Sequence, residues 1–132
     1  MVLNLSKQKL LLLAITYTIF VYVISLIKVQ SPVKISISNF DKVVHFGIYF
    51  VFTLVWFACF SGLEFKKRIF KGVFKASLLA FFVGLSIELL QEFLRKARSG
   101  DVYDVLANSL GILMAVVLLY QIKKYRELNS VK

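Results

Sequence analysis

Four long hydrophobic runs constrain this chain more than any other feature. They occupy residues 10–27, 43–60, 73–94 and 104–122, and the second is interrupted only by His45. About 20 apolar residues in succession are enough for a helix to cross the hydrocarbon core of a bilayer. The pattern therefore predicts an all-α membrane protein with four transmembrane helices in a compact bundle. The short connections predict one domain over residues 1–132.

Composition excludes several other classes of protein. Hydrophobic residues make up 59% of the chain and charged residues 18%, with a mean hydropathy of +0.79, which is far from the composition of a soluble domain. The net charge of +10 does not indicate nucleic-acid binding, because a chain made of spans has no groove-reading element. Cys59 is the only cysteine, which rules out a disulfide within the chain. The first run is longer than the apolar region of a signal peptide and is interpreted as a retained span.

Lysine and arginine are distributed unequally between the two sides of the predicted bundle. Eleven fall on the N-terminus, the connection between the second and third runs, and the C-terminal tail, against six on the other side. Short loops rich in these residues stay in the cytoplasm. Both termini are therefore predicted to be cytoplasmic, where the basic residues would meet anionic membrane lipids.

Polar residues enter the last three runs at one end only, the end predicted to face outward. Helical spacing places the residues of each run on one face, and a rise of 1.5 Å per residue puts them roughly 6–10 Å below the helix ends. Because ionised groups in lipid cost several kcal/mol, these faces should point into the bundle and pair with one another. We predict an outward-facing polar site that comprises Asp41, His45, Tyr49, Glu88, Gln91, Arg98, Asp101, Asp104 and Asn108. Beneath it, Ala107, Gly111 and Ala115 are spaced for close helix packing, as are Ala80 and Gly84.

Three segments around these residues resemble the signature blocks of a known family. DKVVHFGIYF (residues 41–50), GLSIELLQ (84–91) and RSGDVYDVLANSLG (98–111) are similar, in this order, to blocks of the VanZ-like membrane proteins. The resemblance runs from about residue 41 to residue 115. It implies a small multi-pass protein of the bacterial cytoplasmic (inner) membrane, in a family named for a member linked to teicoplanin resistance. The resemblance assigns no role to its signature positions, which are Asp41, His45, Tyr49, Glu88, Gln91, Arg98, Asp104 and Asn108.

The first interpretation of the polar site is binding. Carboxylates and the Asn108 amide would meet hydroxyl or amide groups, and Arg98 would meet phosphate. The expected ligands are an envelope lipid, a lipid-linked precursor or an amphiphilic antibiotic such as a glycopeptide.

Catalysis and scaffolding are the alternatives. His45 would act as a general acid or base with Glu88 or Asp104, or the three would hold a divalent metal. The chain contains no HExxH, GxSxG or phosphate-binding glycine loop, so we expect a non-enzyme without a cofactor. In a scaffold, Asp41 would cap a helix and the other polar residues would hold helices together. Metal binding and oligomeric state stay open.

Overall fold

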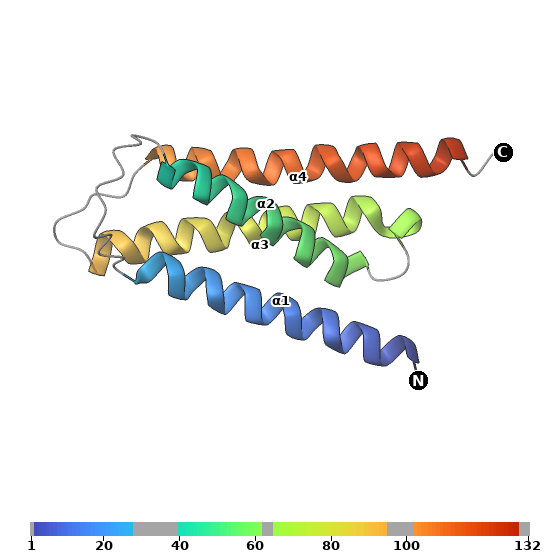
Figure 1. The fold of residues 1–132 in the computed structure, drawn as a ribbon, viewed down its shortest axis with the longest axis horizontal. Helices are drawn as coiled ribbons and strands as arrows, with labels where there is room; N and C mark the ends of the chain where they lie inside the picture. The colour runs from blue at the N-terminus through green and yellow to red at the C-terminus, as the bar shows by residue number, and fades with distance from the viewer. Residues whose placement is uncertain (1, 28–39, 62–64, 95–101, 130–132) are drawn as a thin grey trace.

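The computed structural model describes residues 2–27, 40–61, 65–94 and 102–129 of the 132-residue chain. Within these ranges the chain forms four helices, α1 (Val2–Leu26), α2 (Phe40–Ser61), α3 (Phe65–Leu94) and α4 (Val102–Asn129), which pack as a bundle (Figure 1). All four are long and apolar enough to cross a membrane. The predicted all-α membrane fold with four spanning helices is therefore confirmed.

The helices are longer than the hydrophobic runs that predicted them. The third run begins at residue 73, whereas α3 begins at Phe65 and contains 30 residues. At 1.5 Å per residue such a helix is about 45 Å long, which exceeds the roughly 30 Å of the hydrocarbon core. Lysine, arginine and glutamate are good helix formers, so the backbone stays helical beyond the apolar residues and into the headgroup region.

The chain passes through the bundle so that both termini lie at the same end (Figure 1). At the opposite end, α1 and α3 finish and α2 and α4 begin. We call this second end the polar end, because Asp41 in the first turn of α2 and Asp104 in the first turn of α4 lie there. Placing both termini on one side agrees with the predicted topology, and their cytoplasmic location stays a prediction.

The core consists of two clusters of buried side chains along α2, α3 and α4, and α1 contributes Val21 to the first of them. The cluster nearer the polar end contains Val21, Tyr49, Phe52, Ala80, Val83, Ile87 and Ile112. The cluster nearer the termini contains Phe57, Ile69, Val73, Ala76 and Leu119. Large apolar side chains such as Phe82, Phe93 and Leu113 face outward instead. An apolar outer surface around a packed interior is the arrangement expected of helices surrounded by lipid.

The most extensive contact between two helices joins α2 and α4, and Gly111 lies within it against the backbone of α2. A Cβ atom built on Gly111 would overlap the backbone carbonyl oxygen of Phe46 and lie 3.0 Å from the backbone nitrogen of Phe50. Ala107 and Ala115 are buried on the same face of α4. Small residues therefore let the two backbones approach with no side chain between them.

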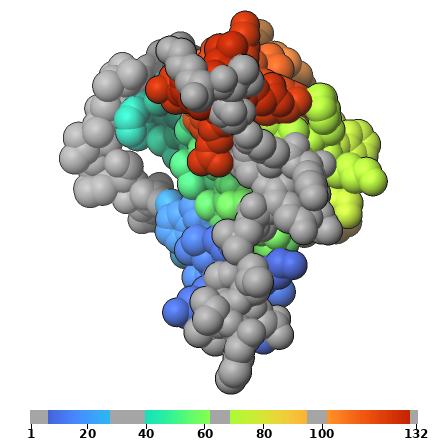
Figure 2. Space-filling model, turned by 90° about the vertical axis from the view of Figure 1, so that its right-hand side faces the viewer, coloured from blue at the N-terminus to red at the C-terminus, as the bar shows by residue number. Residues whose placement is uncertain are grey.

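Polar contacts attach α1 to the rest of the bundle. The Tyr17 hydroxyl donates to the carbonyl oxygen of Ile48 at 3.1 Å, and the Trp56 indole donates to the Thr18 hydroxyl at 3.0 Å. Only 11% of the α1 span is buried, against 33% for α3 and for α4. Viewed from the end that carries the termini, α1 (blue) lies at the edge of the molecule (Figure 2). Individual hydrogen bonds thus contribute more to holding α1 than to holding the other helices.

Replacing Thr18 by valine tests this attachment. The valine keeps the shape of the side chain but removes the acceptor of the Trp56 indole, so we expect a loss of about 0.5–1.5 kcal/mol in the free energy of unfolding. Trp56 is the only tryptophan, so its fluorescence during detergent-induced unfolding reports on the surroundings of this one indole. Thr18→Ser retains the hydroxyl and should behave as the wild type. Identical emission and unfolding midpoints for the valine and serine variants would contradict the prediction.

Candidate functional site

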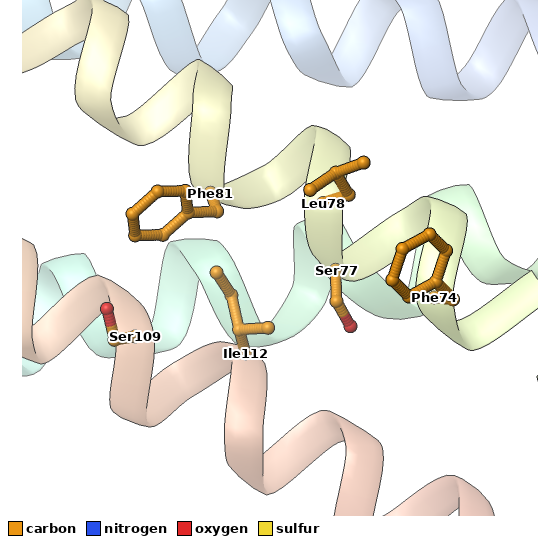
Figure 3. A pocket seen from close by; sticks show the side chains of 6 residues that line it. All are labelled: Phe74, Ser77, Leu78, Phe81, Ser109 and Ile112. Atoms are coloured by element: carbon orange, nitrogen blue, oxygen red, sulfur yellow. The ribbon is translucent and has the colours of Figure 1, made fainter.

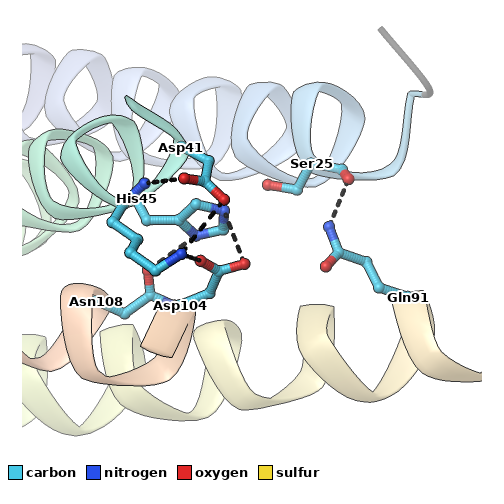
Figure 4. Close-up of polar contacts among 7 residues, drawn as sticks. Ser25, Asp41, His45, Gln91, Asp104 and Asn108 are labelled. Carbon is cyan, nitrogen blue, oxygen red and sulfur yellow. Dashed lines mark hydrogen bonds and ion pairs between the residues drawn. The ribbon is translucent and has the colours of Figure 1, made fainter. Parts of the chain in front are cut away.

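Polar side chains from α2, α3 and α4 meet at the polar end of the bundle. Figure 4 shows several of them, with side chains from α2 and α4 pointing toward one another. We define the polar cluster as Asp41, Lys42, His45, Glu88, Asp104 and Asn108. Asp104 and Asn108 lie one turn apart on α4, as do Asp41 and His45 on α2, so each helix presents its pair on one face.

His45 occupies the middle of the polar cluster. Its Nδ1 atom lies 3.1 Å from Oδ1 of Asn108, and its Nε2 atom lies 3.9 Å from Oδ2 of Asp104. An amide oxygen only accepts hydrogen bonds, so Nδ1 carries a proton and donates it to Asn108. In the neutral ring, Nε2 then carries the lone pair and faces the Asp104 carboxylate at a distance longer than a hydrogen bond.

Asp41 and Lys42 form the more exposed rim of the cluster. The Lys42 Nζ atom lies 3.6 Å from Oδ2 of Asp41 and 4.0 Å from Oδ1 of Asp104. The Asp41 side chain is 43% exposed and the Lys42 side chain 26%. Lys42 was absent from the predicted site because a lysine near the end of a span was interpreted only as a signal of membrane topology. Its position next to Asp41 in the first turn of α2 is the signal that would have indicated it.

Three members of the cluster are deeply buried. Relative exposures are 6% for Glu88, 3% for Asp104 and 5% for Asn108. One donor atom from each of His45, Glu88 and Asp104 lies within 4.8 Å of the other two. An imidazole and two carboxylates at this spacing can accept hydrogen bonds, exchange protons or coordinate a cation.

Tyr49 and Gly84 form the floor beneath the cluster. Tyr49 is 1% exposed, and a Cβ atom built on Gly84 would lie 3.1 Å from its Cε1 atom and 3.2 Å from Nδ2 of Asn108. Within the described parts of the chain, the Tyr49 hydroxyl has no hydrogen-bond partner. The glycine thus leaves room for the ring and the amide, which lie against α3.

The remaining predicted site residues are placed differently. The Gln91 amide donates a hydrogen bond of 2.7 Å to the backbone carbonyl of Ser25 on α1, and in Figure 4 it lies away from His45. Its helical spacing from Glu88 indicated a shared side of α3, but the Gln91 side chain turns toward α1 instead. Arg98 and Asp101 lie outside the described residues.

An apolar groove of about 290 Å³ runs between α3 and α4 (Figure 3). Its lining is formed by Phe74, Ser77, Leu78, Phe81, Ser109 and Ile112. Phe81 lies seven residues before Glu88, so the two side chains project from nearly the same face of α3, two turns apart. The groove therefore begins deeper in the bundle than the polar cluster.

Comparison with known proteins agrees with the signature blocks around this site. A curated relative, the uncharacterized protein C11E3.10 of the fission yeast Schizosaccharomyces pombe, is 35% identical over 83 residues. The alignment covers 59% of this chain and 45% of the yeast protein, so the chain spans less than half of that relative. No solved structure matches. The family model described as VanZ/LLP1 matches residues 3–124, which include α2, α3, most of α1 and α4 and every residue of the polar cluster, and the chain belongs to this family.

Proposed function

We propose that the polar cluster binds the polar headgroup of an amphiphile drawn from the membrane. The observation that supports this most directly is the convergence of three membrane helices on the buried Glu88 and Asp104 carboxylates beside a more exposed rim. Ionisable groups inside a membrane bundle are costly and are found where a ligand or an ion is handled. The rim at Asp41 and Lys42 gives a headgroup a way to reach the buried carboxylates.

The chemistry of the cluster defines the class of headgroup. The carboxylates accept hydrogen bonds from hydroxyl and amine groups, and Lys42 can donate to a phosphate or carbonyl oxygen. A phospholipid, a lipid-linked precursor and an amphiphilic antibiotic such as a glycopeptide all carry such groups. Their common feature is a polar, hydrogen-bonding head joined to an apolar part.

The groove between α3 and α4 fits the apolar part of the same ligand. Its lining is almost entirely apolar, and Phe81 places its upper end two turns below Glu88 on α3. An acyl chain that follows the groove would run parallel to the helices, as lipid chains do. The excess of basic residues at the ends that carry the termini supports an orientation in which the headgroup site faces away from the cytoplasm.

Copurification of a ligand tests the proposal. The full chain is purified in mild detergent, and the bound amphiphiles are identified by native mass spectrometry and by extraction. We expect Glu88→Gln and Asp104→Asn to retain about 10- to 100-fold less of one specific amphiphile, because a hydrogen bond to a charged group contributes about 1.5–3 kcal/mol. Both substitutions preserve side-chain shape, so the loss would reflect charge.

Glu92→Gln is the matched control. Glu92 lies one turn beyond Glu88 on α3 and is exposed, so this variant should retain the amphiphile at the wild-type level. Leu78→Trp narrows the groove and should reduce retention of long-chain more than short-chain ligands. Equal amphiphile content in the wild type and all variants would show that lipid associates nonspecifically and that the polar cluster is not a binding site. Failure of both isosteric variants to fold would contradict the proposal and favour a scaffold.

A further inference from the structure

We infer that His45, Glu88 and Asp104 form a binding site for a divalent transition-metal ion of the Zn²⁺ class. The three residues come from three helices, and their donor atoms lie within 4.8 Å of one another. The inference goes beyond amphiphile binding and does not depend on it, since an ion needs only these three side chains.

The hydrogen bond from His45 to Asn108 is the first argument for a metal. Because Asn108 Oδ1 accepts the proton of Nδ1, the Nε2 lone pair points toward Oδ2 of Asp104, 3.9 Å away. Two atoms that both offer lone pairs repel unless a proton or a metal cation lies between them, and the 3.9 Å separation is longer than the hydrogen bond that a proton would form. A histidine that ligates a metal through one nitrogen normally donates its other N–H to an oxygen, as His45 does here.

Spacing and ligand type define the class of ion. Zn²⁺ binds nitrogen and oxygen donors at 2.0–2.2 Å, so the donors around a tetrahedral ion lie roughly 3.4 Å apart. Side-chain rotations that move the three donor atoms by about an ångström would bring them to this separation. An imidazole ligand favours Zn²⁺ and its transition-metal neighbours over Mg²⁺ and Ca²⁺, which prefer oxygen alone. Three protein ligands leave a fourth position for an external oxygen.

Tyr49 supplies an independent indication of a ligand. Its hydroxyl is buried and has no hydrogen-bond partner within the described residues, and its ring lies against Gly84, one turn before Glu88 on α3. Burying an unsatisfied hydroxyl is costly, so native proteins usually supply a partner. An oxygen bound at the fourth position of the ion would supply one beside Glu88.

A substitution at Lys42 distinguishes a metal site from a structural ion pair. Its ammonium group lies 4.0 Å from Oδ1 of Asp104 and therefore competes with a cation for that carboxylate. Lys42→Gln is expected to tighten Zn²⁺ binding several-fold. If Asp104 served only to pair with Lys42, the same variant would bind no more Zn²⁺ than the wild type and would only lose stability.

Metal stoichiometry provides the direct test. The full chain is purified with a tag that contains no histidine, incubated with Zn²⁺, desalted and analysed by elemental mass spectrometry. We expect about one Zn²⁺ per chain in the wild type and in Glu92→Gln, and a weakening beyond 100-fold in Glu88→Gln and Asp104→Asn. Asn108→Ala should weaken binding about 10- to 100-fold, the usual effect of removing the partner that orients a ligating histidine. Excess Mg²⁺ should not displace the Zn²⁺.

A second measurement does not require any variant to fold. His45 is the only histidine, so ¹⁵N-histidine NMR of the wild-type chain gives one pair of ring-nitrogen signals. We expect a protonated Nδ1 without metal, and a shift of the Nε2 signal on addition of Zn²⁺. Retention of less than a tenth of an equivalent of Zn²⁺, or an unchanged Nε2 signal, would overturn the inference. Loss of Zn²⁺ with retention of a specific amphiphile would leave the proposed function intact.

Discussion

Replacing Gly111 by valine is expected to prevent α2 and α4 from packing together. The first atom of any side chain at this position would overlap the carbonyl oxygen of Phe46, which belongs to backbone and cannot rotate away. Overpacking by a methyl group costs about 1–3 kcal/mol, so alanine should be poorly tolerated and valine should lower the stability further. Because α2–α4 is the most extensive helix contact, its loss would also separate His45 from Asp104.

Gly47 provides the matched control for this prediction. It lies within α2, on the other helix of the pair, but a Cβ atom built there meets nothing within 4 Å. Gly47→Ala should leave stability unchanged or raise it by up to about 1 kcal/mol, because alanine has the higher helix propensity. Detergent-induced unfolding followed by Trp56 fluorescence measures both variants. Equal midpoints for Gly111→Val and Gly47→Val would show that the close contact between the two backbones does not form.

Replacing Gly84 by leucine should disrupt the polar cluster while the bundle still forms. A Cβ atom at this position approaches side-chain atoms of Tyr49 and Asn108, which can move, instead of backbone atoms. The larger leucine would push the Asn108 amide away from Nδ1 of His45. Loss of this orienting contact should weaken metal binding about 10- to 100-fold.

The two effects of Gly84→Leu are separable by measurement. Trp56 lies at the junction of α1 and α2, so its fluorescence should show a folded bundle. The ¹⁵N signals of the single histidine should show a mixture of ring tautomers in place of one protonated Nδ1. Gly84→Ala, which requires a shift of only a few tenths of an ångström, should give an intermediate loss of Zn²⁺. An unchanged His45 spectrum in the leucine variant would show that Asn108 does not orient the ring.

The sequence predicted the fold closely because lipid imposes a simple rule. Every backbone group must be satisfied within its own segment, so a long apolar run in a chain of this kind becomes a helix. The same rule says little about where a helix ends. Lysine-rich and glutamate-rich ends such as those of α3 and α4 remain helical outside the hydrocarbon core, where hydropathy carries no information about backbone structure.

Helical periodicity identified the faces of the polar site but not the partners within it. His45, Glu88 and Asp104 were predicted to share one end of the bundle, and the structure brings their donor atoms together. Spacing along one helix does not specify how far a flexible side chain reaches toward another helix. Gln91 therefore contacts α1, and Lys42 joins the cluster, for reasons that depend on the packing of helices distant in sequence.

The close approach of the α2 and α4 backbones at Gly111 has a mechanical consequence for ligand entry. Sliding one helix along the other would move the carbonyl oxygen of Phe46 from Gly111 toward the methyl group of Ala107 or Ala115, so the pair behaves as a stiff plate that carries His45 and Asp104 at a fixed separation. Helix α3 lies against this plate through rotatable side chains of Tyr49 and Asn108. We therefore expect the tilt of α3 to change more readily than the separation of α2 and α4. A change in the tilt of α3 would alter two things together: the distance of Glu88 from His45 and Asp104, and the width of the groove between α3 and α4.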